Sequence, residues 1–202
     1  MAELLASERE RAILHAARTR FAYYGFSKVT MDEIAADVSM AKASLYYYFP
    51  TKERLWESVL AQEKDQFLTE IEVVLTKPIS ASEKLRKYAQ KRFELFRELV
   101  NLSAVSLSGV GDVNKVFGNL FAELEQEEVK LVLRILQEGR RSGEFTLSNP
   151  HQTAELIPHV LQGLRARAVR KLHDARPAED VYESVKQEGK LLIEHLLQGM
   201  TR

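Results

Sequence analysis

Apolar residues recur at spacings of three and four through most of the chain, which is the pattern of helices with one buried face. Residues that cap or end helices divide this pattern into segments. The predicted helices cover residues 7–24, two short segments within 30–52, then 51–76, 80–99, a short segment within 102–111, 112–140, a helix opened at 149–150 and a last one after 176–177. No segment alternates apolar and polar residues as a strand would. We therefore expect an all-α fold.

Residues 30–38 form the first of two short helices that carry most of the functional information. Thr30 with Glu33 is a capping box, in which each side chain bonds a free backbone N–H group of the other residue. The apolar residues that follow Thr30 lie at offsets 0, 3, 4 and 7 from Met31, so we expect one face of this helix to be buried and the other to be exposed to solvent. Ser39 follows as a turn residue.

The second short helix is defined by Leu45 and Phe49, and it ends before Pro50 because the residue preceding a proline is pushed out of the helical region. At about 100° per residue, Ala43 and Tyr47 lie opposite Leu45. The outward side therefore carries small residues, hydroxyl groups and a lysine. Such a helix can enter the major groove of DNA, where hydroxyls and cations bind phosphates or base edges.

The predicted DNA contacts include the start of the next helix, since N–H groups at a helix N-terminus bind phosphate. We predict DNA-binding roles for Lys28, Thr30, Lys42, Ala43, Ser44, Tyr46, Tyr47, Tyr48, Thr51 and Lys52. Three of these residues have an alternative interpretation. Tyr46 or Tyr48 can be a partly buried packing residue, and Lys28 can be a solvated loop lysine.

The run from residue 34 to residue 55 resembles the helix-turn-helix signature of TetR-type transcriptional regulators. The resemblance is carried by Ile34, Ala35, Ser39, Met40, Ala41, Leu45, Tyr46, Tyr48, Phe49, Lys52, Glu53 and Leu55. Two positions depart from the family pattern. Ser39 replaces its turn glycine, and Ala41 replaces its capping serine, a loss of about 1 kcal/mol. The resemblance covers about the first quarter of the chain and implies a dimeric regulator that binds DNA.

The position of this motif predicts two domains. Residues 1–53 form a DNA-binding head in which the helix at 7–24 supports the two motif helices. Residues 54–202 form a larger helical body for ligand binding and dimerisation. The helix at 51–76 is shared by head and body, so it can act as a mechanical link between them.

The last two helices have more apolar surface than the end of a chain needs, which favours an interface between two copies. The predicted interface residues are Leu156, Val160, Gly163, Leu164, Val185, Gly189, Leu192 and Leu196. The resemblance implies the same homodimer, and the alternative is packing within one chain. A two-fold dimer would place its recognition helices roughly 34 Å apart and read a palindrome.

Aromatic residues in the middle of the chain, together with a proline inside a helix at position 158, are the best candidates for a ligand pocket. We predict that a small, largely apolar effector binds Tyr88, Phe93, Phe96, Phe117, Phe121 and His159. Most of these residues can equally be plain core.

Composition narrows the class of protein. The chain has 202 residues and no cysteine, which excludes disulfides and thiolate chemistry and favours the reducing cytoplasm. We expect neither a secretory signal nor a membrane span. Residues 1–53 hold seven Lys/Arg and seven Asp/Glu, and this neutral head counts against strong non-specific DNA binding without excluding a specific site.

Catalytic and metal-binding motifs are missing from the sequence, so we expect no enzyme, no metal site and no cofactor. Glu155 and His159 lie one helical turn apart, but a solvated glutamate beside a packing histidine explains them. Cations cluster between Arg165 and Arg176. They can attract an anionic ligand, although the dipole at a helix C-terminus also favours them.

These features together predict a ligand-responsive, sequence-specific regulator of transcription. We expect a repressor that an effector releases from double-stranded operator DNA. The alternative is a helical ligand-binding or scaffold protein without a DNA role.

Overall fold

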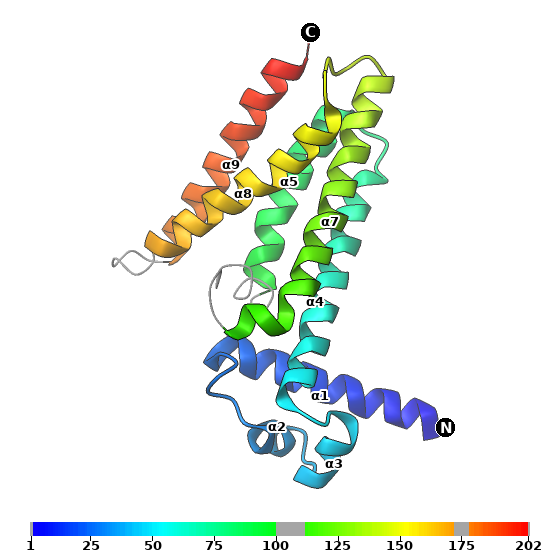
Figure 1. Ribbon diagram of the computed structural model, residues 1–202, viewed down its shortest axis with the longest axis vertical. Helices are drawn as coiled ribbons and strands as arrows, with labels where there is room; N and C mark the ends of the chain where they lie inside the picture. Colours follow the sequence, from blue (N-terminus) through cyan, green and yellow to red (C-terminus); the bar gives the residue numbers. More distant parts are fainter. Residues whose placement is uncertain (1, 100–111, 172–177, 202) are drawn as a thin grey trace. The chain divides into compact units, whose positions relative to one another are not determined.

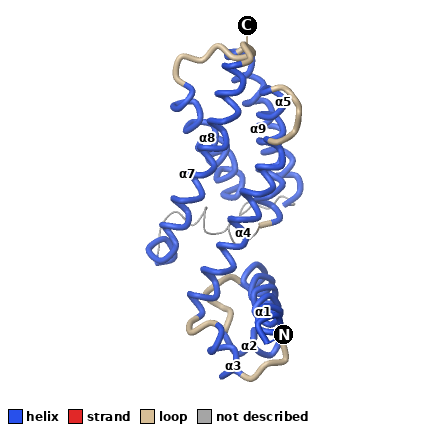
Figure 2. The backbone as a smooth tube through the Cα atoms, turned by 90° about the vertical axis from the view of Figure 1, so that its right-hand side faces the viewer, coloured by secondary structure: helices blue, strands red, loops and turns tan. Residues whose placement is uncertain are grey.

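The computed structural model describes residues 2–99, 112–171 and 178–201, and within them every regular element is a helix (Figure 1). Side chains are described except at residues 2–7, 112–118, 121, 168–171 and 178–181. The helices are α1 Ala2–Tyr24, α2 Met31–Asp37, α3 Lys42–Tyr48, α4 Lys52–Leu75, α5 Ala81–Glu98, α7 Asp112–Arg141, α8 Pro150–Lys171 and α9 Ala178–Met200. Figure 2 shows these helices joined by loops, without a strand in the described ranges. The all-α prediction is confirmed.

The chain divides into two compact units. The first comprises residues 1–65 with 99–117, and the second comprises residues 66–98 with 118–202. The first unit therefore holds α1, α2, α3 and the beginning of α4. The second holds the end of α4, most of α7, and α5, α8 and α9. The domain boundary predicted after residue 53 stays a prediction.

The first unit is built around apolar side chains that all its helices contribute. Ile13 of α1, Ile34 of α2, Leu45 of α3 and Leu55 of α4 are each completely buried. Their burial follows from the helical spacing of apolar residues, because each helix offers one apolar side. The core fixes α3 against α2 and leaves the opposite side of α3 to solvent.

Local signals set the ends of α1. Gly25 adopts φ +79°, a left-handed conformation that glycine takes without strain, and its N–H donates to the Phe21 carbonyl at 2.9 Å. This confirms the predicted end of the helix. Its beginning differs from the prediction, because the helix extends back to Ala2 rather than starting at residue 7.

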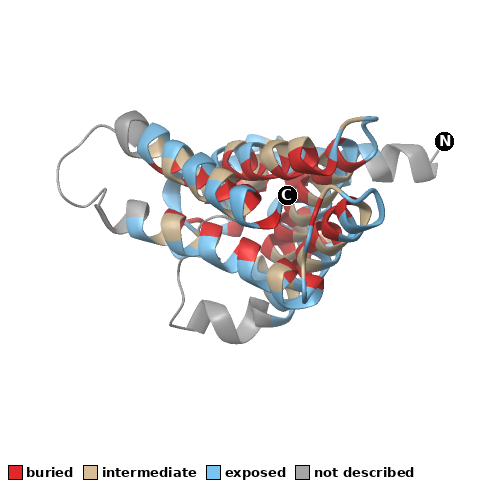
Figure 3. Ribbon diagram, turned by 90° about the horizontal axis from the view of Figure 1, so that it is seen from above, coloured by how far each residue is buried: buried red, intermediate tan, exposed pale blue. Residues whose placement is uncertain are grey.

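The second unit packs α9 against both α5 and α8. Buried positions lie on the sides of the helices that face one another (Figure 3). Gly189 of α9 allows the closest approach, since a Cβ atom there would lie 2.2 Å from a ring carbon of Phe93 on α5. Val185, one turn earlier, is also buried.

Val185 and Gly189 therefore correct the predicted dimer interface. Both residues were expected to face a second copy, but they are buried within one chain, with Gly189 against Phe93 of α5. The apolar spacing identified the buried face of α9 correctly. It could not tell which helix covers that face.

The start of α5 is capped by a residue far away in the sequence. The Glu144 carboxylate accepts hydrogen bonds from the backbone N–H groups of Ala81 and Ser82, each at 2.9 Å. Desolvation raises the pKa of Glu144, but the bonds from Ser82 and Ala81 outweigh it and hold that pKa below its usual value. Ser80 adds a local cap by accepting from the N–H of Glu83 at 3.2 Å.

Some predictions fall outside what the structure describes. The short helix predicted within 102–111 and the break at Arg176 and Pro177 lie outside the described residues. The same holds for the side chains of Phe117 and Phe121 and for most of the predicted basic cluster.

Candidate nucleic-acid interface

The start of α2 is fixed by the capping box that the sequence predicts. The Glu33 N–H donates to Thr30 Oγ1 at 3.3 Å, and the Thr30 N–H donates to Glu33 Oε2 at 2.8 Å. Hydrogen bonds from the Thr30 backbone and then from its side chain lower the pKa of Glu33. Because Glu33 remains a carboxylate at neutral pH, both bonds persist there.

A strained turn leads from α2 to α3. Ser39 takes φ +52°, the left-handed region that the turn glycine of the resembled family implies at this position. The next N–H, that of Met40, donates to the Ala35 carbonyl at 2.9 Å and closes the turn. Ala41 is the N-cap of α3 and makes no side-chain cap bond, as its methyl group dictates. Backbone bonds therefore define this turn, while the buried core and the ion pair of Lys42 with Asp32 also join α3 to α2.

The outward side of α3 is as exposed as its spacing predicts. Leu45 is completely buried and Phe49 nearly so, whereas Tyr47 on the other side is 86% exposed. Ala43 and Ser44 are exposed beside Tyr47. The helix thus presents small and hydroxyl-bearing residues to solvent, with enough room for a large partner.

The two tyrosines beside Tyr47 differ in how far they are exposed. Tyr46 is 39% exposed, and Tyr48 is half-buried with its ring edge-on to Tyr47, 5.6 Å between ring centres. Tyr47 is therefore the most accessible of the three hydroxyls, and Tyr48 orients its ring.

A broad hollow of about 790 Å³ runs over the outward side of α3. Its lining includes Ala43, Ser44 and Tyr47 of α3, the turn residue Ser39, and Arg9 from α1. Arg9 is not among the predicted DNA contacts, because nothing in the spacing of α1 indicates which residue of that helix lies beside α3. Its guanidinium adds a cation to a lining that otherwise consists of hydroxyl-bearing and apolar side chains.

Lys42 lies at the start of α3 and is held by an exposed ion pair. Its Nζ atom lies 2.8 Å from Asp32 Oδ1, and the two side chains are 58% and 60% exposed. The hydrogen bond with Asp32 raises the pKa of Lys42. An exposed pair of this kind is weak, so a phosphate can compete with Asp32 for the lysine.

Lys52 has a different environment from the other predicted contacts. Its Nζ donates to the carbonyls of Phe26 at 2.9 Å and Val29 at 3.0 Å, and it lies 4.4 Å from the centre of the Phe26 ring. Phe26 in turn stacks on Trp56 with 4.2 Å between ring centres. Lys52 thus fixes the loop that precedes α2, and a direct DNA contact from it stays a prediction.

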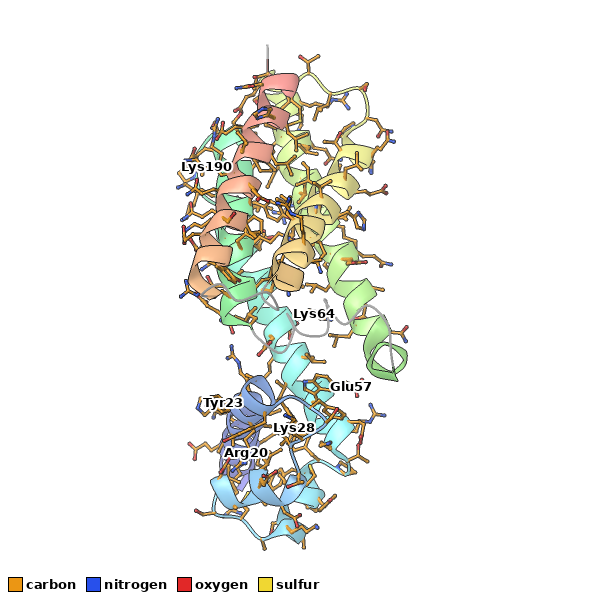
Figure 4. All side chains as sticks on the ribbon, turned by 90° about the vertical axis from the view of Figure 1, so that its left-hand side faces the viewer. Arg20, Tyr23, Lys28, Glu57, Lys64 and Lys190 are labelled. Atoms are coloured by element: carbon orange, nitrogen blue, oxygen red, sulfur yellow. The ribbon has the colours of Figure 1, made fainter. Side chains whose placement is uncertain are left out.

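The remaining predicted contacts are accessible. Thr30, Lys28 and Thr51 are exposed, and Thr51 Oγ1 caps α4 by accepting from the Arg54 N–H at 3.1 Å. Figure 4 labels Lys28 among the side chains of this unit. The cap leaves other N–H groups at the start of α4 without helical partners, which suits a phosphate.

Arg20 joins α1 to α2 and neutralises acidic groups there. It forms a two-point contact with Asp37, with Nη2 to Oδ1 at 2.7 Å, and it lies 3.5 Å from Glu33 (Figure 4). The hydrogen bonds from Arg20 lower the pKa of Asp37. Two carboxylates that would repel DNA are therefore paired with a guanidinium.

The described side chains among the predicted effector residues lie in different surroundings. Tyr88 is buried and donates its hydroxyl proton to Glu128 Oε1 at 2.7 Å, and Phe93 packs on Gly189. Among the predicted residues with described side chains, Phe96 and His159 line a common cavity, a small space of about 20 Å³. The charged residues around it were not predicted.

Part of the predicted dimer surface is open to solvent in the single chain. Leu156 is 55% exposed and Val160 is 41% exposed, while Gly163 has open space beside it. Leu191 of α9, which was not predicted, is 59% exposed. Leu164, Leu192 and Leu196 are half-buried.

Other kinds of site find little support in the part of the chain that the structure describes. No group of three or more His, Asp or Glu side chains there could hold a metal ion. Nor is any described helix both long and apolar enough to cross a bilayer.

Known proteins resemble this chain in both sequence and structure. The profile of the family described as bacterial regulatory proteins, tetR family, matches residues 13–59, which span α2, α3 and parts of α1 and α4. A transcriptional regulator from Cytophaga hutchinsonii ATCC 33406 is 38% identical, and its crystal structure covers 94% of this chain and 97% of its own with a TM-score of 0.82.

More distant similarities are found both in structure and in sequence. A protein from Mesorhizobium loti MAFF303099, described as a TetR-family transcriptional regulator, is 17% identical and shares the fold with a TM-score of 0.75 over 97% of this chain and 98% of that one. Nucleoid occlusion factor SlmA of Salmonella paratyphi B is 26% identical over 166 residues, which are 77% of this chain and 80% of that protein.

Proposed function

The chain belongs to the tetR family of bacterial regulatory proteins, a family of DNA-binding transcriptional regulators, and on this basis we propose that it is a ligand-controlled repressor. As a homodimer it binds a palindromic operator through α3. A small effector binds in the second unit and lowers operator affinity. A cytoplasmic location and the lack of any catalytic activity belong to the same proposal.

The observation that carries the proposal is the exposed side of α3. Tyr47 is 86% exposed and stands beside Ala43 and Ser44 over a hollow of about 790 Å³. Small residues allow the helix to approach base edges, and the hydroxyls can donate to bases or phosphates. Lys42 and Arg9 at the same surface supply cations for the backbone.

Dimerisation is supported by the apolar residues that one chain leaves uncovered. Leu156 and Val160 lie one turn apart on α8, and Leu191 is exposed on α9. A two-fold interface buries such a surface against its own copy, which is the usual closure of soluble oligomers. Two α3 helices about 34 Å apart would then meet successive turns of a major groove.

Control by an effector requires that the ligand bind two states of the protein unequally. Helix α4 begins in the first unit and ends in the second. Because it is one continuous helix, a shift of its second half also displaces its first half. We expect effector binding to change how the two α3 helices are spaced in the dimer. Operator affinity falls when that spacing no longer matches the duplex.

The test begins with purified protein and fragmented genomic DNA, from which bound fragments are selected to define the operator. In gel retardation, the double variant Lys42→Ala, Tyr47→Ala should then bind this operator with at least tenfold lower affinity. Size-exclusion chromatography should show an unchanged oligomer. Tyr23→Ala is the matched control, since Tyr23 is 81% exposed but lies on α1. Retardation that the double variant leaves unchanged contradicts the proposal.

A further inference from the structure

The second unit contains charged side chains where a helical core is normally apolar. Arg92 of α5 and Glu128 of α7 are each 2% exposed, and Arg165 of α8 is 5% exposed. Arg92 Nε donates to Glu128 Oε1 at 2.6 Å, and the hydroxyl of Tyr88 donates to the same oxygen at 2.7 Å. Buried ions are costly, so a cluster of this kind calls for an explanation beyond stability.

One donor of this cluster is unused. Glu128 accepts from Nε of Arg92 and, at 3.4 Å, from its Nη2, but Nη1 finds no hydrogen-bond partner among the described residues. A buried donor of a charged group that lacks an acceptor is rare, because it loses its bonds to water without replacing them. Arg92 lines the cavity of about 20 Å³ that also touches Phe96 and His159.

A second positive charge lies against the same aromatic ring as the first. The guanidinium carbon of Arg165 lies 4.1 Å from the centre of the Phe96 ring, and that of Arg92 lies 4.7 Å from the same centre. Burial, and then the charge of Arg92, lower the pKa of Arg165 to about 9. An anion placed beside this ring would stabilise both guanidinium groups.

The wall of this cavity is partly apolar, so it can also contact an apolar part of a ligand. Phe96, Leu124, Val129 and Pro158 contribute apolar surface to its wall, and the exposed His159 marks where it reaches solvent. Its volume is enough for about one water molecule, so a larger guest requires the wall to move. Pro158 has no N–H to bond the preceding turn, which makes this part of α8 the easiest to displace.

We propose that the effector carries a carboxylate, which binds Arg92 and Arg165, and an apolar remainder that displaces α8 near Pro158. The regulatory meaning of this site rests on the proposed function. A monoanion fits better than a dianion such as phosphate, because the Glu128 carboxylate remains beside Arg92 and repels excess negative charge. The exposed Leu156 and Val160 lie on the same helix, so its displacement reaches the proposed dimer surface.

The first experiment compares three probes of equal chain length on the full protein by isothermal titration calorimetry. They are octanoate, 1-octanol and octylammonium. We expect octanoate to bind at least tenfold more tightly than 1-octanol, and octylammonium not to bind. Equal affinities for octanoate and 1-octanol, or no octanoate binding, would overturn the assignment.

Substitutions of the buried charged residues test where octanoate binds. Arg165→Met leaves the bonds between Arg92 and Glu128 intact, and Arg92→Met with Glu128→Gln removes that pair together, so that neither member of the pair stays buried without the other. Both proteins should unfold cooperatively on heating and bind octanoate at least tenfold more weakly. If both bind octanoate as the unaltered chain does, the site is elsewhere.

Arg86→Gln is the matched control. Arg86 also lies on α5 and also bonds one carboxylate, that of Glu194, through Nε at 2.8 Å and Nη2 at 3.0 Å, but it is 40% exposed. We expect octanoate affinity to be unchanged in this variant. A cavity of about 280 Å³ between α5 and α9 is lined by Arg86 and Glu194. Loss of binding in Arg86→Gln alone would assign the ligand to that cavity and overturn the proposal.

Gel retardation with the selected operator separates this proposal from the proposed function. A protein that binds octanoate but retards no DNA fragment contradicts the regulatory function and leaves the carboxylate site intact. A protein that retards the operator but shows no preference for octanoate contradicts only the carboxylate site.

Discussion

One ion pair in each unit of this protein shows how differently charged side chains can be placed. In the first unit the pair of Lys42 and Asp32 lies in solvent, with both side chains more than half exposed. In the second unit Arg92 and Glu128 are almost completely buried. Exposed pairs exchange partners easily and are screened by salt, whereas a buried pair cannot be broken without leaving an ion in the core. The first arrangement suits a surface that binds a polyanion, and the second suits an enclosed site for one small ligand.

The largest effect should come from breaking the buried pair. Glu128→Ala leaves the charge of Arg92 and the hydroxyl of Tyr88 without their common acceptor. We expect it to lower the free energy of unfolding by about 3–5 kcal/mol. Urea denaturation followed by circular dichroism measures this loss. A loss below about 1 kcal/mol would show that the pair of Arg92 and Glu128 behaves as a solvated pair and not as a buried one.

Two helical glycines give the next test, because they differ only in their surroundings. A Cβ at Gly189 would lie 2.2 Å from the Phe93 ring, while nothing lies within 4 Å of one at Gly163. Gly189→Ala should destabilise the fold by about 1–3 kcal/mol through overpacking. Gly163→Ala should stabilise an isolated chain by about 0.5–1 kcal/mol, since alanine favours helix.

The same pair of variants examines the dimer. If Gly163 lies in a close contact between two copies, Gly163→Ala weakens the dimer even though it stabilises the helix. Analytical ultracentrifugation over a range of concentrations detects this change. A dimer that is unaffected by Gly163→Ala would remove Gly163 from the proposed interface.

A smaller effect is expected at Glu144, with a defined dependence on pH. Its folded-state pKa is lowered, so its contribution is complete above the unfolded value near 4.5 and is lost as the pH falls through the folded value. Glu144→Gln should cost about 1 kcal/mol at pH 7 by weakening the cap of α5. Thermal unfolding at pH 7 and at pH 3 should show the full difference at pH 7 and a smaller difference at pH 3.

The smallest effect on the fold should come from Asp32→Ala, which frees Lys42 and removes a carboxylate near the proposed DNA surface. The melting temperature should barely change, while operator binding becomes tighter. Lys42→Ala should reduce the slope of log affinity against log salt by about 1. Fluorescence anisotropy at several salt concentrations measures both variants, and identical slopes in all proteins would show that Lys42 contacts no phosphate.

The sequence predicts the first unit well because its signals are local. The capping box of Thr30 and Glu33, the left-handed turn at Ser39 and the end of α1 at Gly25 each depend on residues within a few positions. The exposure of Tyr47 follows from its position opposite Leu45 on one short helix. Arg9 escaped prediction because its place beside α3 depends on tertiary packing.

The second unit was less predictable because its decisive contacts link residues far apart in the chain. Arg92 stands four residues after Tyr88 and four before Phe96, on the buried side of α5, and its carboxylate partner lies 36 positions later. A charged residue within an apolar stripe is a signal that the sequence contains, but it does not identify the carboxylate partner. Which helix covers Gly189 cannot be read from spacing, since a period identifies an apolar face and not its partner.

Operator affinity of two single-tyrosine variants tests the central claim most directly. Tyr47→Ala removes the most exposed side chain of α3, and Tyr23→Ala removes an equally exposed tyrosine of α1. In anisotropy titrations with the selected operator, we predict that Tyr47→Ala weakens binding at least tenfold while Tyr23→Ala matches the unaltered protein. Equal affinities of the two variants for the operator would contradict the account.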